Sequence, residues 1–209
     1  MALQFSEVIT AEDQIRAVVG TPHQRVLRKQ IDHLDEHARA FLARSPFLLI
    51  ASSDAAGGVD VSPKGDPAGF VRVLDATTLA IPDRPGNRRI DTLRNVLQRP
   101  GVGLIFLIPG KEETLRVNGT ARIVTDRWVR EPMAIAGKLP DFAIVVDVQE
   151  VFFHCAKCVI RSGLWNSGAW PQLDGLASLA QALVAQGRLE QSVEEVHALI
   201  EKDKRERLY

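Results

Sequence analysis

The sequence predicts a mainly β fold, with six or so strands at barrel-like spacing and helices on either side. The middle of the chain carries short runs of β-branched and aromatic residues, separated by turns rich in Gly, Pro and Asp. Both ends of the chain carry apolar residues at helical spacing instead. The strand–helix alternation of a dinucleotide-binding fold is missing, as are its G-x-G-x-x-G motif and a P-loop.

The first long helix is expected to begin at Thr21-Pro22, since proline favours the first helical position. It should end at Ser45, because the residue before Pro46 avoids the α region. One apolar stripe runs along it: Leu27, Ile31, Leu34, Ala38 and Phe41.

Strands are predicted at 47–51, 59–64, 70–74, 78–81, 102–108, 114–124 and 142–154. The first is a purely apolar run, which suits a strand buried on both faces. In 114–124 apolar and polar residues alternate, so a half-buried strand with a polar second face is expected. Further helices are predicted at 125–138 and from 176 onward, and a short one should place Ile90, Leu93 and Leu97 on one side.

Composition narrows the class of protein. The chain has 209 residues with 26 basic and 26 acidic side chains, so it lacks the charge expected of a nucleic-acid binder. No run approaches the roughly 18 apolar residues of a membrane span, and residues 1–15 do not resemble a signal peptide. Two cysteines do not make a disulfide framework. We therefore expect a cytoplasmic protein with reduced thiols, without a membrane or nucleic-acid partner.

We expect one structural domain with three parts: N-terminal helices packed on the barrel in 1–45, the barrel in 46–162, and a loop with C-terminal helices in 163–209.

Two stretches have the chemistry of an anion site. In the first, Ser62 and Lys64 close a predicted strand and offer a hydroxyl donor and a point charge for a phosphate. The alternative is a polar hairpin end. In the second, Asn87, Arg88 and Arg89 stand just before a predicted helix. Cations there oppose the helix dipole unless an anion lies between, which favours phosphate binding over a solvated basic loop.

Two further stretches are ambiguous. The polar face around Arg116, Asn118 and Arg122 could meet water, line a ligand groove or form a dimer contact. His154, Cys155 and Cys158 have residue types that bind zinc, but no second ligand pair is visible and the setting of a redox dithiol is missing. A buried thiol pair at a strand end is the ordinary interpretation, and no metal is expected. Serine-hydrolase motifs and paired carboxylates are also missing, so in an enzyme a cofactor would carry the reaction.

The order of the segments PFLLIASSD, VDVSPKGD, TLAIPDRPGNRRIDTLRN and GVGLIFLIPGKEETLRVNGTARIV resembles the FMN-binding split barrel of the pyridoxamine 5'-phosphate oxidase superfamily. The match spans roughly residues 40–160. It is most similar to a bacterial branch in which FFHCAKC-type and RSGLW-type segments follow the barrel. This resemblance implies a six-stranded antiparallel split β-barrel and a homodimer with FMN between the subunits.

The resemblance also implies roles for individual residues. It places Ser62 and Lys64 beside the flavin, and Ile81, Pro82 and Asp83 against its ring. Asn87, Arg88 and Arg89 would hold the phosphate. Thr114 and Arg116 would contact the flavin, and His154, Cys155 and Lys157 would approach it from the partner subunit.

One departure from the family pattern matters. True pyridoxamine-phosphate oxidases carry an Arg-Leu-His-Asp-Arg-type segment for the substrate phosphate, and this chain has none. We therefore predict a flavoprotein that passes electrons through FMN to oxygen or a small organic acceptor, not an oxidase of vitamin B6. The alternatives are a non-catalytic FMN carrier or sensor, a split barrel that uses deazaflavin or haem, and a structural dimer with a vestigial pocket.

Overall fold

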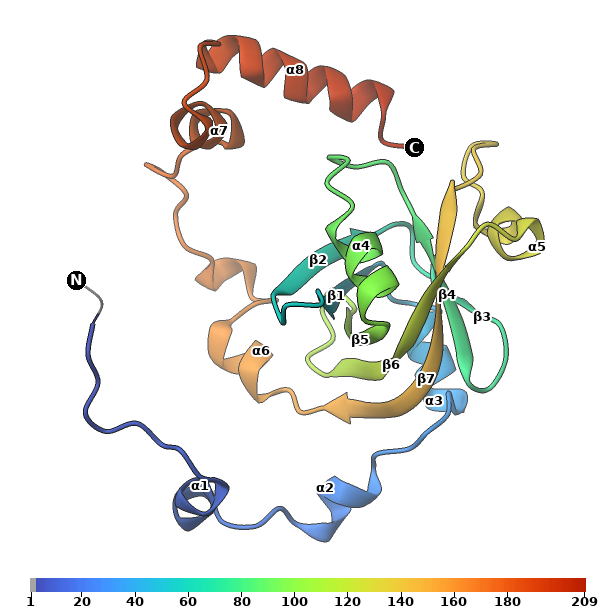
Figure 1. The fold of residues 1–209 in the computed structure, drawn as a ribbon, viewed down its shortest axis with the longest axis vertical. Coiled ribbons are helices and arrows are strands. Elements are labelled where there is room, and N and C mark those ends of the chain that lie inside the picture. Colours follow the sequence, from blue (N-terminus) through green and yellow to red (C-terminus); the bar gives the residue numbers. More distant parts are fainter. Residues whose placement is uncertain (1–2) are drawn as a thin grey trace.

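Seven strands form one antiparallel sheet in the computed structural model, which describes residues 3–209 (Figure 1). They are β1 (Phe47–Ser53), β2 (Val59–Gly65), β3 (Arg72–Val73), β4 (Thr78–Asp83), β5 (Gly101–Leu107), β6 (Thr114–Val124) and β7 (Phe142–His154). Their order across the sheet is β2-β1-β5-β6-β7-β4-β3. The predicted split barrel is confirmed, but the expected six strands are seven, because the two-residue β3 pairs with β4.

The sheet curls so that its two ends meet. β2 is first and β4 sixth in the order, yet Lys64 Nζ of β2 lies 2.9 Å from Asp83 Oδ1 of β4. Directly after these strands, Arg84 Nε lies 2.6 Å from Asp66 Oδ2. We call this junction, defined by Lys64, Asp66, Asp83 and Arg84, the β2–β4 seam. Ion pairs, and not a hydrogen-bonded ladder, therefore join the two strands on this side of the barrel.

Alternating side chains of the strands fill the barrel. In β6 the predicted alternation is confirmed, since Leu115 and Val117 are fully buried and Ala121 is nearly so. The expectation that β1 is buried on both faces is wrong. Leu48 and Ile50 are fully buried, but Phe47 is 38% exposed, because one face of β1 lies outside the barrel.

The predicted helix over 21–45 is two helices, α2 (Gln24–Arg28) and α3 (Glu36–Leu42), preceded by α1 (Glu12–Val19). Between them Ile31 exchanges backbone hydrogen bonds with Val151 of β7, 3.0 and 2.7 Å long, which a continuous helix would forbid. The Asp35 side chain then starts α3 by accepting from Ala38 N at 2.8 Å. Of the three helices, only α3 has buried residues, namely Ala38, Phe41 and Leu42.

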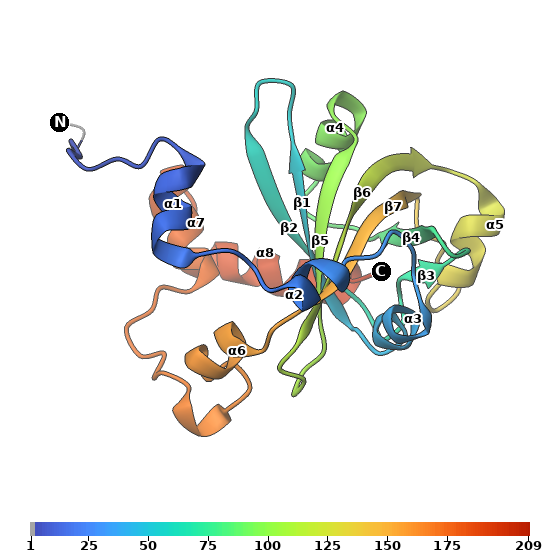
Figure 2. The same cartoon turned by 90° about the horizontal axis from the view of Figure 1, so that it is seen from below.

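α4 (Asp91–Gln98) covers the opposite end of the barrel from α3 (Figure 2). Of the predicted apolar side, Leu93 packs against the barrel core, but the prediction is wrong for Leu97 and Ile90, which are 78% and 55% exposed. The buried residues are Thr92, Asn95 and Val96. Asn95 Nδ2 donates to Ser52 Oγ of β1 at 3.1 Å and to Asp60 Oδ2 of β2 at 2.8 Å, so polar contacts orient this helix.

The remaining helices lie toward the C-terminus. Instead of one helix over 125–138 there are α5 (Arg127–Arg130) and the 3-10 turn η1 (Glu131–Met133), with Pro132 in that turn. α6 (Lys157–Ser162) follows β7, then η2 (Ser167–Ala169), α7 (Leu179–Gly187) and α8 (Val193–Glu206). Within residues 3–209, no helix combines the length and apolar character needed to cross a bilayer.

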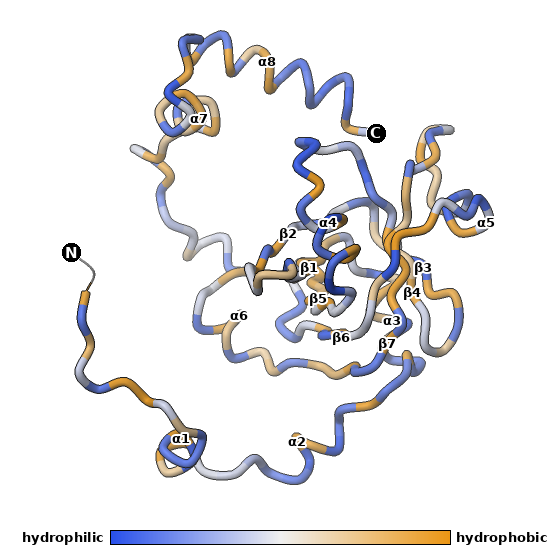
Figure 3. Tube along the Cα trace, viewed as in Figure 1, coloured by the Kyte–Doolittle hydropathy of each residue, from blue (hydrophilic) through white to orange (hydrophobic). Residues whose placement is uncertain are grey.

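The arms at both ends of the chain expose large apolar side chains. Figure 3 shows apolar stretches outside the barrel, and Val18, Leu176 and Leu179 are 84%, 70% and 62% exposed.

Gly119 permits the close pairing of β6 and β7. The register shifts between Asn118 and Gly119, and a Cβ at Gly119 would lie 2.1 Å from the Asp147 carbonyl oxygen. We expect Gly119→Ala to lower the free energy of unfolding by about 1–3 kcal/mol, the usual cost of overpacking. Urea denaturation measures this change.

Gly101→Ala is the matched control, since a Cβ at Gly101 of β5 meets no atom within 4 Å. If both variants unfolded at the same urea concentration, the close approach of the two strands would be refuted.

Candidate functional site

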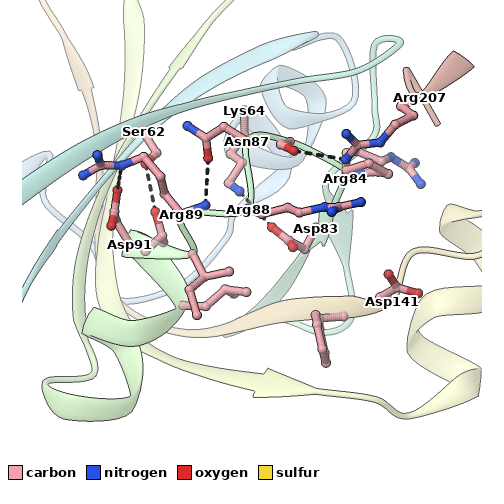
Figure 4. A pocket seen from close by; sticks show the side chains of 16 residues that line it. Ser62, Lys64, Asp83, Arg84, Asn87, Arg88, Arg89, Asp91, Asp141 and Arg207 are labelled. Atoms are coloured by element: carbon pink, nitrogen blue, oxygen red, sulfur yellow. Dashed lines mark hydrogen bonds and ion pairs between the residues drawn. The ribbon is translucent and has the colours of Figure 1, made fainter. Parts of the chain in front are cut away.

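A cavity of about 520 Å³ lies at the β2–β4 seam, in the size range of small-molecule sites. Its walls come from the end of β2, the loop after β4, the start of α4 and the C-terminal end of α8 (Figure 4). Five cations and three carboxylates line it: Lys64, Arg84, Arg88, Arg89 and Arg207, with Asp83, Asp91 and Asp141. Four of these cations have a carboxylate partner, as Lys64 has Asp83, Arg84 has Asp66, Arg89 has Asp91 and Arg207 has Asp203. Arg88 therefore supplies most of the charge that an anionic ligand would meet in this cavity.

The loop before α4 has an unusual backbone conformation. Arg88 and Ile90 have φ of 62° and 56°, in the left-handed region that a β-branched residue such as isoleucine avoids. Such positions cost about 1–3 kcal/mol each and cluster at ligand sites. Asn87 Oδ1 accepts from Arg89 N at 3.0 Å and so fixes the turn.

This loop ends at a helix N-terminus that no side chain from residues 3–209 caps. The first backbone N–H groups of α4 are therefore available to an acceptor from outside the helix. Thr92, in the first turn, donates from Oγ1 to Ser62 Oγ at 2.9 Å, which holds the end of β2 against α4.

Arg88 and Arg89 of the loop differ in their ion pairing. Arg89 Nε lies 2.7 Å from Asp91 Oδ2, and this hydrogen bond raises the pKa of Arg89. Arg88 is exposed and forms no ion pair with any residue in 3–209. Arg88 is therefore the cation of the loop whose charge is not already balanced.

The structure brings together most of the residues that were predicted to hold the phosphate and to lie against the flavin ring, our first group of site residues. Lining the cavity are Ser62, Lys64, Asp83, Asn87, Arg88 and Arg89. Pro82 lines an adjoining cavity of about 410 Å³, which shares Lys64 and Arg84 with the first. Ile81 is fully buried in the core of the barrel and faces neither cavity.

The second group of predicted site residues lies apart from this cavity. It consists of Thr114, Arg116, His154, Cys155 and Lys157. Thr114 pairs in register with His154, and Arg116 with Phe152, so these side chains share one end of the β6–β7 ladder. Cys155 and Lys157 follow at the start of α6. No member of the group lines the cavity, and Figure 2 shows α6 well away from α4. One chain therefore does not unite the two groups.

His154 lies half-buried in a cationic environment. Its ring stacks on Phe152, with centroids 4.9 Å apart, and the Arg116 guanidinium lies 5.3 Å from the Phe152 ring. Burial, and then the charges of Arg116 and Lys29, lower the pKa of His154 below its ordinary value. The imidazole is therefore neutral at pH 7.

The two cysteines differ from the expected buried thiol pair. Cys155 and Cys158 are both free and exposed, because the chain leaves the barrel at His154 and enters the surface helix α6. Within residues 3–209, no three His, Cys, Asp or Glu side chains gather where they could hold a metal.

Sequence reasoning missed Arg84, Thr92, Asp141 and Arg207 as lining residues. Arg84 lay within the basic loop but was indistinguishable from its neighbours without its partner Asp66, which is 18 residues away. Arg207 belongs to a charged helix end that is ordinarily solvated, and only the fold places it beside Gly86.

Comparison with known proteins places this chain in a family. Residues 34–155, over half of the chain, match the family described as pyridoxamine 5'-phosphate oxidase. The chain belongs to this family. No curated protein matches it.

Several solved structures are similar at low sequence identity. HupZ of Group A Streptococcus is 17% identical with a TM-score of 0.48, covering 58% of this chain and 99% of HupZ. A putative pyridoxamine 5'-phosphate oxidase of Lactobacillus delbrueckii is 22% identical with a TM-score of 0.47, covering 58% and 95%. HutZ of Vibrio cholerae, described as a heme storage protein, is 18% identical with a TM-score of 0.42, covering 58% and 93%.

We expect the pKa of His154 to rise in Arg116→Gln but to stay below 6.5, because burial, the largest cause of the shift, remains. NMR titration of the imidazole measures this. The unfolded chain takes up this proton near pH 6.5 and the folded chain only at lower pH. This group therefore lowers the free energy of unfolding as the pH falls below about 6.5.

Arg122→Gln is the control, since Arg122 shares the polar face of β6 but pairs with Asp147 and does not affect His154. Equal pKa values of His154 in both variants would contradict the assigned cause.

Proposed function

We propose that this protein binds FMN at the β2–β4 seam and acts as an oxidoreductase. The observation that carries the proposal is the end of the cavity that the loop before α4 and the first turn of this helix form. There the start of α4, which no side chain of residues 3–209 caps, and Arg88, which has no ion-pair partner in that range, line the same space. A phosphate monoester carries nearly two negative charges at pH 7 and suits such an environment.

The residues of the seam fit the rest of the cofactor. Lys64 of the seam and its neighbours Ser62 and Pro82 line the two adjoining cavities, which would offer a flavin both polar and apolar contacts. Lys64 and Asp83 are about one-fifth exposed and paired, so Lys64 is held in place and retains further N–H donors for a ring acceptor. Bound FMN would supply electron transfer to oxygen or a small organic acceptor, and the chain would position and polarise it.

We propose that two chains complete each site. The second group of residues lies outside the cavity of its own chain, so a symmetric dimer is needed to bring Arg116, His154 and Lys157 to a partner's flavin. The exposed edge strand supports this arrangement, since Val59 and Val61 of β2 are 69% and 60% exposed. The apolar arms before α3 and after α6 would add to the same interface. The barrel, 46–162, with its helical additions would then be the unit that dimerises.

His154 favours haem as the second candidate ligand. A neutral imidazole is what a haem axial ligand requires, and its partly buried ring lies beside apolar Phe152. A Soret band in the purified protein would favour haem, whereas flavin bands would favour FMN. A deazaflavin would be bound in place of FMN, and a carrier or sensor would bind FMN without oxidising NADH or NADPH.

We also propose a cytoplasmic location, because both cysteines are free and exposed, as is usual in a reducing compartment.

We expect wild-type protein to retain FMN after gel filtration, and Arg88→Gln to weaken FMN binding roughly 10- to 100-fold through the loss of charge-assisted hydrogen bonds. Titration of flavin fluorescence measures the dissociation constant.

Arg28→Gln serves as control, because it removes an exposed charge of α2 that does not line the cavity. If Arg88→Gln and Arg28→Gln bound FMN as tightly as the wild type, the phosphate site would be refuted. A colourless wild type that fails to retain added FMN would refute the cofactor.

A further inference from the structure

The C-terminal end of α8 reaches into the candidate site from a distant part of the sequence. Arg207 lines the cavity, and its Nη2 donates to the Gly86 carbonyl at 3.3 Å, in the loop that presents Arg88. Its Nη1 lies 2.6 Å from Asp203 Oδ1, one turn back on the helix. Figure 4 shows Arg207 and Arg88 approaching the cavity from different elements.

The residues after Arg207 are anchored to the barrel. The Tyr209 main-chain oxygen accepts from Lys138 Nζ at 2.7 Å, and the Arg84 guanidinium lies 5.6 Å from the centre of the Tyr209 ring. Burial and the nearby charge of Asp66 raise the pKa of Tyr209. Leu208 and Tyr209 line the adjoining cavity with Lys64 and Arg84. The segment Arg207–Tyr209 therefore lies across the β2–β4 seam.

The remaining donors of Arg207 are suited to an anion. A guanidinium has five N–H donors, and the contacts to Gly86 and Asp203 leave several of them for another acceptor. The planar arrangement of these donors fits two phosphate oxygens at once. Arg88, which forms no ion pair within residues 3–209, lines the same cavity as Arg207, so both side chains are available to one phosphate.

We propose that Arg207 is a further phosphate-binding residue, and that the segment Arg207–Tyr209 closes the cavity over the phosphate of the bound ligand. This inference rests on the proposed function for the identity of the ligand as FMN. The phosphate chemistry itself is shared by FMN and free phosphate. Arg207 would thus distinguish phosphorylated from unphosphorylated flavin, and closure by Tyr209 would slow release.

The test compares FMN with riboflavin, which differs only by the phosphate. In Arg207→Gln we expect FMN affinity to fall roughly tenfold, with riboflavin affinity unchanged. Arg207→Lys should give an intermediate loss, since it keeps the charge without the planar donors. Tyr209→Ala, which removes the ring beneath Arg84, should raise the rate of FMN release.

Arg205→Gln is the matched control, because it removes a charge from the same last turn without lining the cavity. Equal FMN affinity in the Arg207 and Arg205 variants would overturn the inference. An equal fall for FMN and riboflavin would also overturn it, since Arg207 would then support the pocket and not the phosphate.

A wild type that binds no FMN would refute the proposed function but leave a separate test of Arg207. Inorganic phosphate is then the probe, followed by ³¹P line broadening. Weaker binding of phosphate by Arg207→Gln than by Arg205→Gln would support the inference, and equal binding would overturn it.

Discussion

The ion pairs of the β2–β4 seam are the interaction on which the site depends. Lys64–Asp83 and Arg84–Asp66 join strands that the sheet order separates, and so fix the width of the barrel opening. The Asp66 side chain is only 1% exposed, so loss of Arg84 would leave a buried, uncompensated carboxylate. Breaking one member of such a pair is costly, about 3–5 kcal/mol. The loop that carries Arg88 leaves directly from this junction, so closure of the barrel positions the end of the cavity where we propose that phosphate binds.

A second layer of polar contacts sets the direction of α4. Thr92 and Asn95 hydrogen-bond to the β1–β2 hairpin, whereas Ile90 and Leu97 are exposed and Val96 is the apolar residue that this helix buries. Hydrogen bonds are directional, whereas apolar contact is not, so this packing fixes where the helix N-terminus points. The left-handed φ of Arg88 and Ile90 completes the turn into the helix.

The fold could be predicted from sequence because its strands appear as local patterns of apolar and polar residues. The alternation in 114–124 is a property of consecutive residues, and so is the basic loop 87–89. The errors arose where distant contacts override local pattern. Ile31 pairs with Val151 and interrupts a helix, and Asn95 selects the buried face of α4 through partners more than 30 residues away. Arg207 reaches Gly86 across 121 residues, so no local motif indicates it. The sequence likewise did not indicate that Arg88 lies apart from Arg116 and His154, because this separation follows from the arrangement of the strands.

In the dimer that we propose, each flavin site is built from the seam of one chain and the β6–β7 end of the other. Co-expression of two differently tagged chains tests it, one carrying Arg88→Gln and Arg89→Gln, the other Arg116→Gln and Lys157→Gln. Neither variant alone should retain FMN. The purified mixed dimer should regain half the FMN content of the wild-type dimer, since one of its two sites combines both intact groups. A mixed dimer that retains no FMN, while wild-type dimers do, would contradict the shared site.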